Sequence, residues 1–196
     1  MDPSQCPPPT SGAVAIAEVP RAAEADLVLA MGPDGDLVAD RWERGCRAFA
    51  ARREGQIVAY GWLARGPEWI GELGLEIRPG PGEAYIWNCL TLGPHRRQGM
   101  FRSLVLCMAA SARAEGLTRL WLGSVDHVGA RTLAGAGFIP VLRFTVRPLP
   151  WFRRLRVWAS DEADTGLLAA GRRVLFAGGR PLAGDFVLGR AGRRRH

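Results

Sequence analysis

Alternating apolar and polar residues predict the strands of this chain. Two such runs lie on either side of a tight turn within residues 47–65, which is the pattern of a β-hairpin. Residues 83–92 are dense in aromatic and branched side chains and are followed by Gly-Pro, so we expect a strand that ends there. The remaining predicted strands are residues 13–19, 117–125 and 138–148.

Apolar residues at three- and four-residue spacing predict helices between these strands. The clearest helix covers residues 99–115 and ends at Gly116. Its expected buried face holds Phe101, Leu104, Val105, Met108 and Ala112. Shorter helices are expected at residues 22–31, at 34–49 with Leu37, Trp42 and Cys46 on one face, and at 128–138.

The order of these elements predicts one α/β domain with a mixed central sheet of about six or seven strands flanked by helices. The long helix would cross from one strand to a parallel neighbour. After residue 146 the pattern predicts one or two further strands and a terminal helix. Because 196 residues suffice for one such domain with tails, we assign the domain to residues 13–189.

Composition defines the tails and excludes several classes of protein. Residues 1–12 are rich in Pro and small polar residues, without a basic region and an apolar run, which predicts a disordered leader and no signal peptide. Residues 190–196 form a basic tail. No run of about 18 apolar residues occurs, so no membrane span is expected. The four scattered cysteines lack a CxxC pair, which argues against a zinc site and favours a cytoplasmic protein.

Charge is distributed unevenly along the chain. All 26 basic residues are arginine, which excludes a Walker-type lysine and a lysine Schiff base and is typical of GC-rich, bacterial coding. Residues 143–196 hold 12 arginines and 4 acids, whereas residues 1–142 hold 14 arginines and 15 acids. No nucleic-acid-binding motif accompanies the basic C-terminal quarter, so the sequence argues against a nucleic-acid partner.

Residues 93–102 join a strand to the long helix through a turn that suits an anion. The first amides of a helix lack backbone acceptors, and the helix dipole adds positive charge there. Arg96, Arg97 and Arg102 can pair with phosphate oxygens, and Gly99 lets the backbone approach closely. These residues predict a diphosphate-bearing ligand, with a solvated basic turn as the alternative.

This turn contains the first of two motifs, and the second lies downstream of the long helix. Leu92-Gly93-Pro94 ends the strand, and residues 96–101 (RRQGMF) precede the helix. Downstream, residues 120–138 place Asp126 after a strand and end in Gly137-Phe138. This pattern resembles the GNAT superfamily of acyl-CoA-dependent N-acyltransferases, whose first motif is Gln/Arg-x-x-Gly-x-Gly/Ala and whose second begins with Asn. The resemblance implies a GNAT-like fold and acetyl-CoA, or another acyl-CoA, as cosubstrate without a metal.

The same resemblance assigns residues to the cofactor. The backbone of Leu90 and Leu92 would hydrogen-bond the pantetheine arm, and an amide near Leu92 would polarise the thioester carbonyl. Phe101 stands at the small-residue position of the family, and we expect its side chain to point into the core. The remaining cofactor contacts would come from Arg96, Arg97, Gln98, Gly99, Met100, Phe101, Arg102 and Asp126.

Candidates for the chemical step lie beside the pantetheine segment. Asn88 could orient a water or the acceptor, and Cys89 could donate a proton, with a packed apolar cysteine as the alternative. Leu133 stands where many members of the family carry the tyrosine that protonates the departing thiolate, and leucine cannot do so. Further candidates near the acceptor or cofactor are Trp62, Trp69, Tyr85, Trp87, Glu72, Glu76, Glu83 and His127, with packing or a solvated side chain as the alternative.

Three functions follow from these features. The first is an N-acyltransferase, most simply an acetyl-CoA-dependent N-acetyltransferase, in which a small-molecule or peptide amine attacks the thioester directly. A homodimer is left open. The second is a non-catalytic acyl-CoA-binding module, which Leu133 favours. The third is a basic RNA- or ribosome-associated protein, which only the charge supports.

Overall fold

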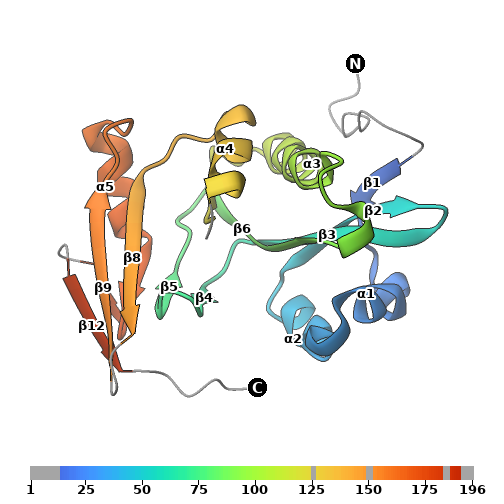
Figure 1. Ribbon diagram of the computed structural model, residues 1–196, viewed down its shortest axis with the longest axis horizontal. Coiled ribbons are helices and arrows are strands. Elements are labelled where there is room, and N and C mark those ends of the chain that lie inside the picture. Colours follow the sequence, from blue (N-terminus) through green and yellow to red (C-terminus); the bar gives the residue numbers. More distant parts are fainter. Residues whose placement is uncertain (1–13, 125–126, 149–151, 183–185, 191–196) are drawn as a thin grey trace. The chain divides into compact units, whose positions relative to one another are not determined.

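Two compact units make up the part of the chain that the structure describes (Figure 1). The structure is a computed structural model that describes residues 14–124, 127–148, 152–182 and 186–190. Unit 1 comprises the described residues up to Gly66 and those within Pro79–Ala136. Unit 2 comprises Pro67–Arg78 and the described residues from Gly137 onward.

Unit 1 is built on a five-stranded mixed sheet of order β1-β2-β3-β6-β7. The first four strands are antiparallel neighbours, and β7 is parallel to β6. The central strand β3 is buried along almost its whole length, as expected for a strand with both faces covered. The strands are β1 (Val14–Glu18), β2 (Arg47–Arg53), β3 (Gln56–Ala64), β6 (Glu83–Thr91) and β7 (Arg119–Leu122).

Helices cover both faces of this sheet. In Figure 1, α1 and α2 lie on one side of it and α3 lies on the other. On the α1–α2 side, Leu27 and Val38 pack with Tyr60 and Trp62 of β3. The helices are α1 (Glu24–Met31), α2 (Leu37–Glu43), α3 (Met100–Ala114) and α4 (His127–Gly135), with short 3-10 turns at Arg21–Ala23, Gly32–Asp34 and Gly93–His95.

The buried face of α3 begins one residue earlier than the sequence predicted. Met100 is 1% exposed and packs with Val58 and Ala59 of β3, whereas Phe101 is half-buried. The left-handed conformation of Gly99 starts the helix so that Met100 takes the core position expected for Phe101. The fully buried positions of the helix are Met100, Leu104, Val105, Cys107, Met108 and Ala112.

The expected apolar face of the second helix also needs a correction. Trp42 and Cys46 are buried, as predicted, but Leu37 is 39% exposed. Residues five apart on a helix are separated by about 140° around its axis, so Leu37 and Trp42 cannot share a narrow face. The predicted β2–β3 hairpin, β6, α3 and α4 are confirmed within a few residues of their expected ends.

Unit 2 contains two antiparallel sheets and the helix α5 (Thr165–Arg173). The predicted terminal helix is therefore not terminal, because strands follow it. The helix begins at Asp164, whose carboxylate accepts a hydrogen bond from the Leu167 amide at 2.7 Å. One sheet has the order β11-β10-β5-β4, from Arg180–Pro181, Leu175–Ala177, Leu75–Ile77 and Glu68–Ile70, and the other has the order β12-β9-β8, from Phe186–Arg190, Phe152–Ala159 and Leu142–Pro148.

The predicted α/β class with a mixed sheet is confirmed. The mixed sheet has five strands, and the further strands belong to the two sheets of unit 2. Within the described residues, no helix has the length and the apolar character needed to cross a membrane.

Candidate functional site

A bulge in β6 opens one edge of the sheet of unit 1. The parallel pairing of β6 with β7 runs only from Glu83 to Ile86 of β6. Beyond it the β3–β6 register shifts, so that Asn88 and Cys89 together stand opposite Gly61. Asn88 has a φ of 46°, a left-handed conformation typical of such a bulge. Past Ile86, the edge of β6 that faces away from β3 has no strand partner among the described residues.

Backbone groups alternate in direction along the open segment. The Leu92 amide donates to the Val58 carbonyl at 2.9 Å, so the backbone groups of Leu92 point toward β3, and those of Leu90 have the same direction. Thr91 therefore faces the open edge, and its carbonyl accepts a hydrogen bond from Arg96 Nε at 3.1 Å. The geometry offers the Thr91 amide to a ligand at this edge, whereas the backbone groups of Leu90 and Leu92, which the sequence suggested, point toward β3.

The turn before α3 presents backbone amides. Arg97 and Gly99 are both left-handed, with φ of 60° and 76°. The Gly99 carbonyl accepts a hydrogen bond from the Ser103 amide at 3.0 Å, and no side chain caps the helix. The amides of residues 100–102 therefore lie at the positive end of a 15-residue helix without an intrahelical acceptor, which is the arrangement of an anion site.

Side chains on β2 fix this turn. Arg53 donates through NH2 to Oε1 of Gln98 at 2.9 Å, and its NH1 lies 3.5 Å from His95 Nδ1. The Gln98 amide also donates to the Pro94 carbonyl at 3.4 Å. Gln98, predicted as a cofactor residue, thus connects the turn to the end of the hairpin.

The three arginines of the turn have different surroundings. Arg96 bonds to the Thr91 carbonyl, and Arg102 donates through NH2 to the Gly135 carbonyl of α4 at 3.2 Å. Arg97 is exposed. Two of the predicted phosphate ligands, Arg96 and Arg102, therefore also connect structural elements, although their side chains are exposed like that of Arg97.

The thiol of Cys89 faces the core. Its Sγ lies 2.6 Å from the point where a Cβ on Gly61 would stand, close to side chains of α3. Burial raises the pKa of the Cys89 thiol to about 12. A thiol this weakly acidic stays protonated at neutral pH and is a poor nucleophile. The structure thus favours the packed apolar cysteine.

A buried cation lies on the other face of the bulge. Arg41 of α2 is 4% exposed, and its guanidinium carbon lies 5.0 Å from the ring centroid of Trp62 and 4.4 Å from that of Trp87. Its NH1 donates to Oδ1 of Asn88 at 2.8 Å. We name Arg41, Trp62, Trp87 and Asn88 the Arg41 cluster. Its hydrogen bond and cation–π contacts hold the side chain of Asn88 at the bulge.

The aromatic residues predicted to wall an acceptor pocket are divided between the units. Trp62 and Trp87 are direct cross-strand neighbours in unit 1, and Tyr85 lies two residues before Trp87 on β6. Trp69 belongs to unit 2 and is 60% exposed. The indole nitrogens of Trp62 and Trp87 are buried without a hydrogen-bond partner in the described part of the chain, and both rings make a cation–π contact with Arg41.

Tyr60 adds a second titratable group on this side of the sheet. It is 2% exposed, and burial is the main cause that raises the pKa of its phenol. Asp34 raises that pKa further, whereas Arg41 lowers it. Tyr60 is therefore protonated at neutral pH and is a hydrogen-bond donor in that range.

Two of the three predicted glutamates, Glu76 and Glu83, form ion pairs, and Glu72 is exposed. Glu83 is buried and accepts hydrogen bonds from Arg119 NH1 at 2.7 Å and from Trp121 Nε1 at 3.0 Å, across the β6–β7 pair. In unit 2, the Arg78 guanidinium bonds to Glu76 and lowers the pKa of that carboxyl. Both carboxylates are tied to cations, and the lowered pKa of Glu76 makes that carboxylate a weak base.

The downstream motif supplies no acid at its expected position. Leu133 of α4 is 7% exposed and apolar. Asp126 lies outside the described residues, as does the side chain of His127. Across the described ranges, no group of three or more His, Cys, Asp or Glu side chains could hold a metal ion.

Two arginines of the site were missed by the sequence reasoning. Arg41 is 47 residues from Asn88, and Arg53 is 45 residues from Gln98. The position of Arg41 next to the apolar Trp42 on a short helix was the one local signal that could have marked it, because arginine is rarely buried without a specific partner.

Comparisons with known proteins show what this chain is similar to in sequence and fold. The model of the acetyltransferase (GNAT) family matches residues 21–138. Among solved structures, AAC(6')-Iy in complex with the bisubstrate analog CoA-S-monomethyl-acetylneamine is 13% identical, with 65% of this chain and 91% of that chain covered and a TM-score of 0.50.

Two further solved structures have lower TM-scores. Ribosomal-protein-alanine N-acetyltransferase from Brucella melitensis biovar Abortus 2308 is 21% identical over 62% of this chain and 86% of that chain, with a TM-score of 0.45. IAA acetyltransferase from Bacillus cereus ATCC 14579 is 18% identical over 67% and 81%, with a TM-score of 0.49. No curated protein matches the chain.

Proposed function

The chain belongs to the GNAT family of acetyltransferases, and on that premise we propose that it transfers an acetyl group from acetyl-CoA to an amine acceptor. The observation that carries the proposal is an open β6 edge that leads directly to an uncapped helix N-terminus. An acyl-CoA uses both features, since the amides of its pantetheine arm can pair with a strand edge and its pyrophosphate with helix amides.

We assign the pyrophosphate to the start of α3. The φ of 76° at Gly99 favours a residue without Cβ, and the absence of a Cβ lets phosphate oxygens approach the amides of residues 100–102. Arg97 supplies accessible positive charge, while Arg96 and Gln98 hold the turn in place. Asp126 and the amide of Phe101 remain predicted contacts of the cofactor.

We assign the pantetheine arm and the thioester to the open edge between the bulge and Thr91. The acceptor amine attacks the thioester carbonyl carbon, the C–S bond breaks, and the amine loses one proton while the sulfur gains one. Asn88, held by Arg41, is positioned at the bulge to orient the acceptor or a water. Because like charges disfavour one another, the buried Arg41 cation lowers the pKa of an amine bound nearby and so favours its neutral, nucleophilic form.

Proton delivery to the sulfur is the step for which the side chains differ from the pattern of the family. A buried leucine at position 133 cannot donate a proton, and the Cys89 thiol with its pKa of about 12 is a weak acid. We propose that the thiolate leaves as such and takes its proton from water. The same observation on Leu133 favours the second candidate function, a non-catalytic acyl-CoA-binding module.

Two measurements on the full chain distinguish the two candidate functions. Acetyl-CoA at about a hundred times its Kd should add roughly 2.7 kcal/mol of stability, which raises the Tm by about 5–10 °C for a chain of this size. Release of free thiol should then be followed with a panel of small amines, peptides and aminoglycosides. No shift in Tm would contradict both candidates, and a shift without thiol release from any amine would favour the module.

We also propose that the protein acts in the cytoplasm, on a small-molecule or peptide amine. The sequence left a homodimer open, and sedimentation of the purified chain would decide between monomer and dimer.

A further inference from the structure

One face of the β8–β9 hairpin in unit 2 carries a surface that the acyltransferase proposal does not use. Directly opposed residues of an antiparallel pair share one face. The register opposes Arg143 to Trp158, Thr145 to Arg156 and Arg147 to Arg154, and all six residues are exposed. The alternate residues Leu155 and Val157 are buried. We name the exposed set the arginine face: Arg143, Thr145, Arg147, Arg154, Arg156 and Trp158.

The charge of this face is one-sided. Between residues 142 and 160 five residues are arginine and none is acidic. Arg147 and Arg154 stand directly opposite one another, an arrangement of like charges that weakens a strand pair. Glu162, 4.0 Å from Arg143, offsets charge at one end of the face. Because an exposed arginine adds little to a core, an anionic ligand is the natural reason to concentrate cations there.

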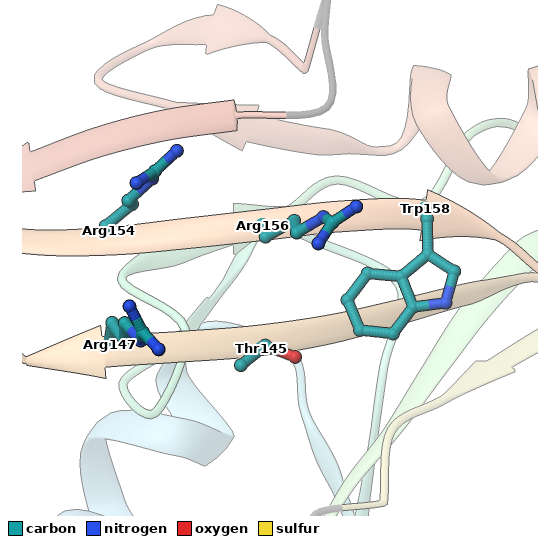
Figure 2. A pocket seen from close by; sticks show the side chains of 5 residues that line it. All are labelled: Thr145, Arg147, Arg154, Arg156 and Trp158. Atoms are coloured by element: carbon teal, nitrogen blue, oxygen red, sulfur yellow. The ribbon is translucent and has the colours of Figure 1, made fainter.

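An indole and a hollow accompany the cations. Arg147, Arg154, Arg156, Thr145 and Trp158 line a hollow of about 380 Å³. Figure 2 shows these side chains standing on the same side of the two strands. Trp158 is 38% exposed, with the Arg156 guanidinium 5.7 Å from its ring centroid. The face therefore combines a planar aromatic surface with several guanidinium groups at the scale of one nucleotide.

We propose that the arginine face binds single-stranded nucleic acid. Guanidinium groups pair with phosphate oxygens in a bidentate geometry. Residues two apart on one strand are separated by about 6.6 Å, so Arg154 and Arg156 can contact different phosphates. A base stacks on the indole of Trp158, and the Thr145 hydroxyl adds a hydrogen-bonding group. An acidic peptide would use the cations but has no ring for the indole, which is why a nucleic acid is favoured.

This inference goes beyond the acyltransferase function. The arginine face belongs to unit 2, whereas the proposed CoA residues belong to unit 1. The sequence argued against a nucleic-acid partner because it contains no binding motif. The register of two strands, which no motif records, brings the arginines and the indole together.

The test measures binding of the full chain to a fluorescently labelled single-stranded RNA of 12 nucleotides by anisotropy. If Arg147, Arg154 and Arg156 each contact one phosphate, the logarithm of the association constant should fall with the logarithm of the salt concentration at a slope of about −2. Affinity should then drop roughly twentyfold between 50 and 200 mM salt. The double variant R147Q/R154Q should reduce the slope by about 1.4 and weaken binding at least tenfold at 50 mM salt. The matched control R173Q/R180Q removes the same charge from unit 2 outside the arginine face and should bind nearly as the parent does.

Further variants measure the contribution of base stacking on Trp158 and the contribution of the basic tail, residues 190–196. Trp158→Leu should weaken RNA binding at least fivefold, with Trp158→Phe in between, and should leave the salt slope unchanged. The inference is overturned if R147Q/R154Q binds like R173Q/R180Q, or if R193Q/R194Q/R195Q alone abolishes binding. It is also overturned if a polyglutamate peptide competes as well as RNA while Trp158→Leu has no effect, which would indicate an acidic protein partner. The Tm shift with acetyl-CoA, measured on every variant, should be unchanged, so loss of RNA binding is distinguished from failure of the CoA site.

Discussion

Gly99 offers the sharpest test of the proposed diphosphate site. Gly99→Asp and Gly99→Asn place side chains of nearly the same size at the start of α3, and only one of them carries charge. Both must adopt the φ of 76°, which costs a residue with a Cβ about 1 kcal/mol. We therefore expect both variants to lose roughly 2–4 °C in Tm and to fold like the parent.

The charge should separate the two variants in CoA affinity. A carboxylate about 6 Å from each of two phosphate charges, in a medium of effective dielectric constant about 40, is repelled by roughly 1.4 kcal/mol per charge. The sum, about 3 kcal/mol, corresponds to a loss of affinity of about a hundredfold for Gly99→Asp relative to Gly99→Asn.

Isothermal titration of CoA into the full chain measures this difference. Because the turn is exposed, the gap between the two variants should shrink when the salt concentration is raised from 0.05 to about 0.5 M. Equal Kd values for Gly99→Asp and Gly99→Asn at low salt would refute the assignment of the pyrophosphate to this turn. If one variant lost far more Tm than the other, its weaker CoA binding would instead come from a damaged fold.

The remaining predictions concern the bulge and the missing acid. Arg41→Gln removes a charged hydrogen bond and two cation–π contacts, so the free energy of unfolding should fall by about 3 kcal/mol. If the decrease in kcat is no larger than the loss of folded protein accounts for, Arg41 has no positioning role. Leu133→Tyr should raise kcat about tenfold over its control Leu133→Phe, and equal kcat values in both would contradict our account of the missing proton donor. Cys89→Ala should keep its activity within about twofold. The native pKa of about 12 lies above the unfolded value of this thiol, so the contribution of the thiol to stability is complete below about pH 9 and is lost as pH rises toward 12. In urea titrations, the free energy of unfolding should therefore decrease less between pH 8 and pH 10.5 in Cys89→Ala than in the parent. An identical decrease in both proteins would count against a buried thiol. Gly61→Ala should cost about 1–3 kcal/mol because its Cβ would meet the Cys89 sulfur, and the double variant with Cys89→Ala should recover part of that loss.

Sequence patterns predicted the part of the candidate site whose residues are neighbours in the chain. The end of β6, the turn and α3 are continuous in sequence, so a Gly-Pro stop, the single glycine at position 99 and a helical stripe sufficed to predict them. The error within this segment was one of register. Spacing cannot decide whether Met100 or Phe101 faces the core, because the conformation of Gly99 sets the starting angle of the helix.

Contacts between distant segments could not be predicted from the sequence. The backbone direction at Leu92 depends on the register between β6 and β3, which shifts at the bulge. Arg41 gains its role only because α2 packs over β3 and β6, which brings its guanidinium to Trp62 and Trp87. A pattern of periodicity identifies elements, but it contains no information on which side chain of one element meets which side chain of another.

The parallel pairing of β6 and β7 has a consequence for the order in which the molecule assembles. The β2–β3 hairpin closes through a turn of two residues, whereas the contact between Glu83 and Arg119 joins positions 36 residues apart and must wait for the α3 crossover. Contacts that close long loops form late in folding, because the entropy of closure comes before any gain in contact energy. The proposed acyl-CoA site would therefore be completed in the last steps of folding. A bound acyl-CoA should then lengthen the lifetime of the folded chain far more than it accelerates refolding.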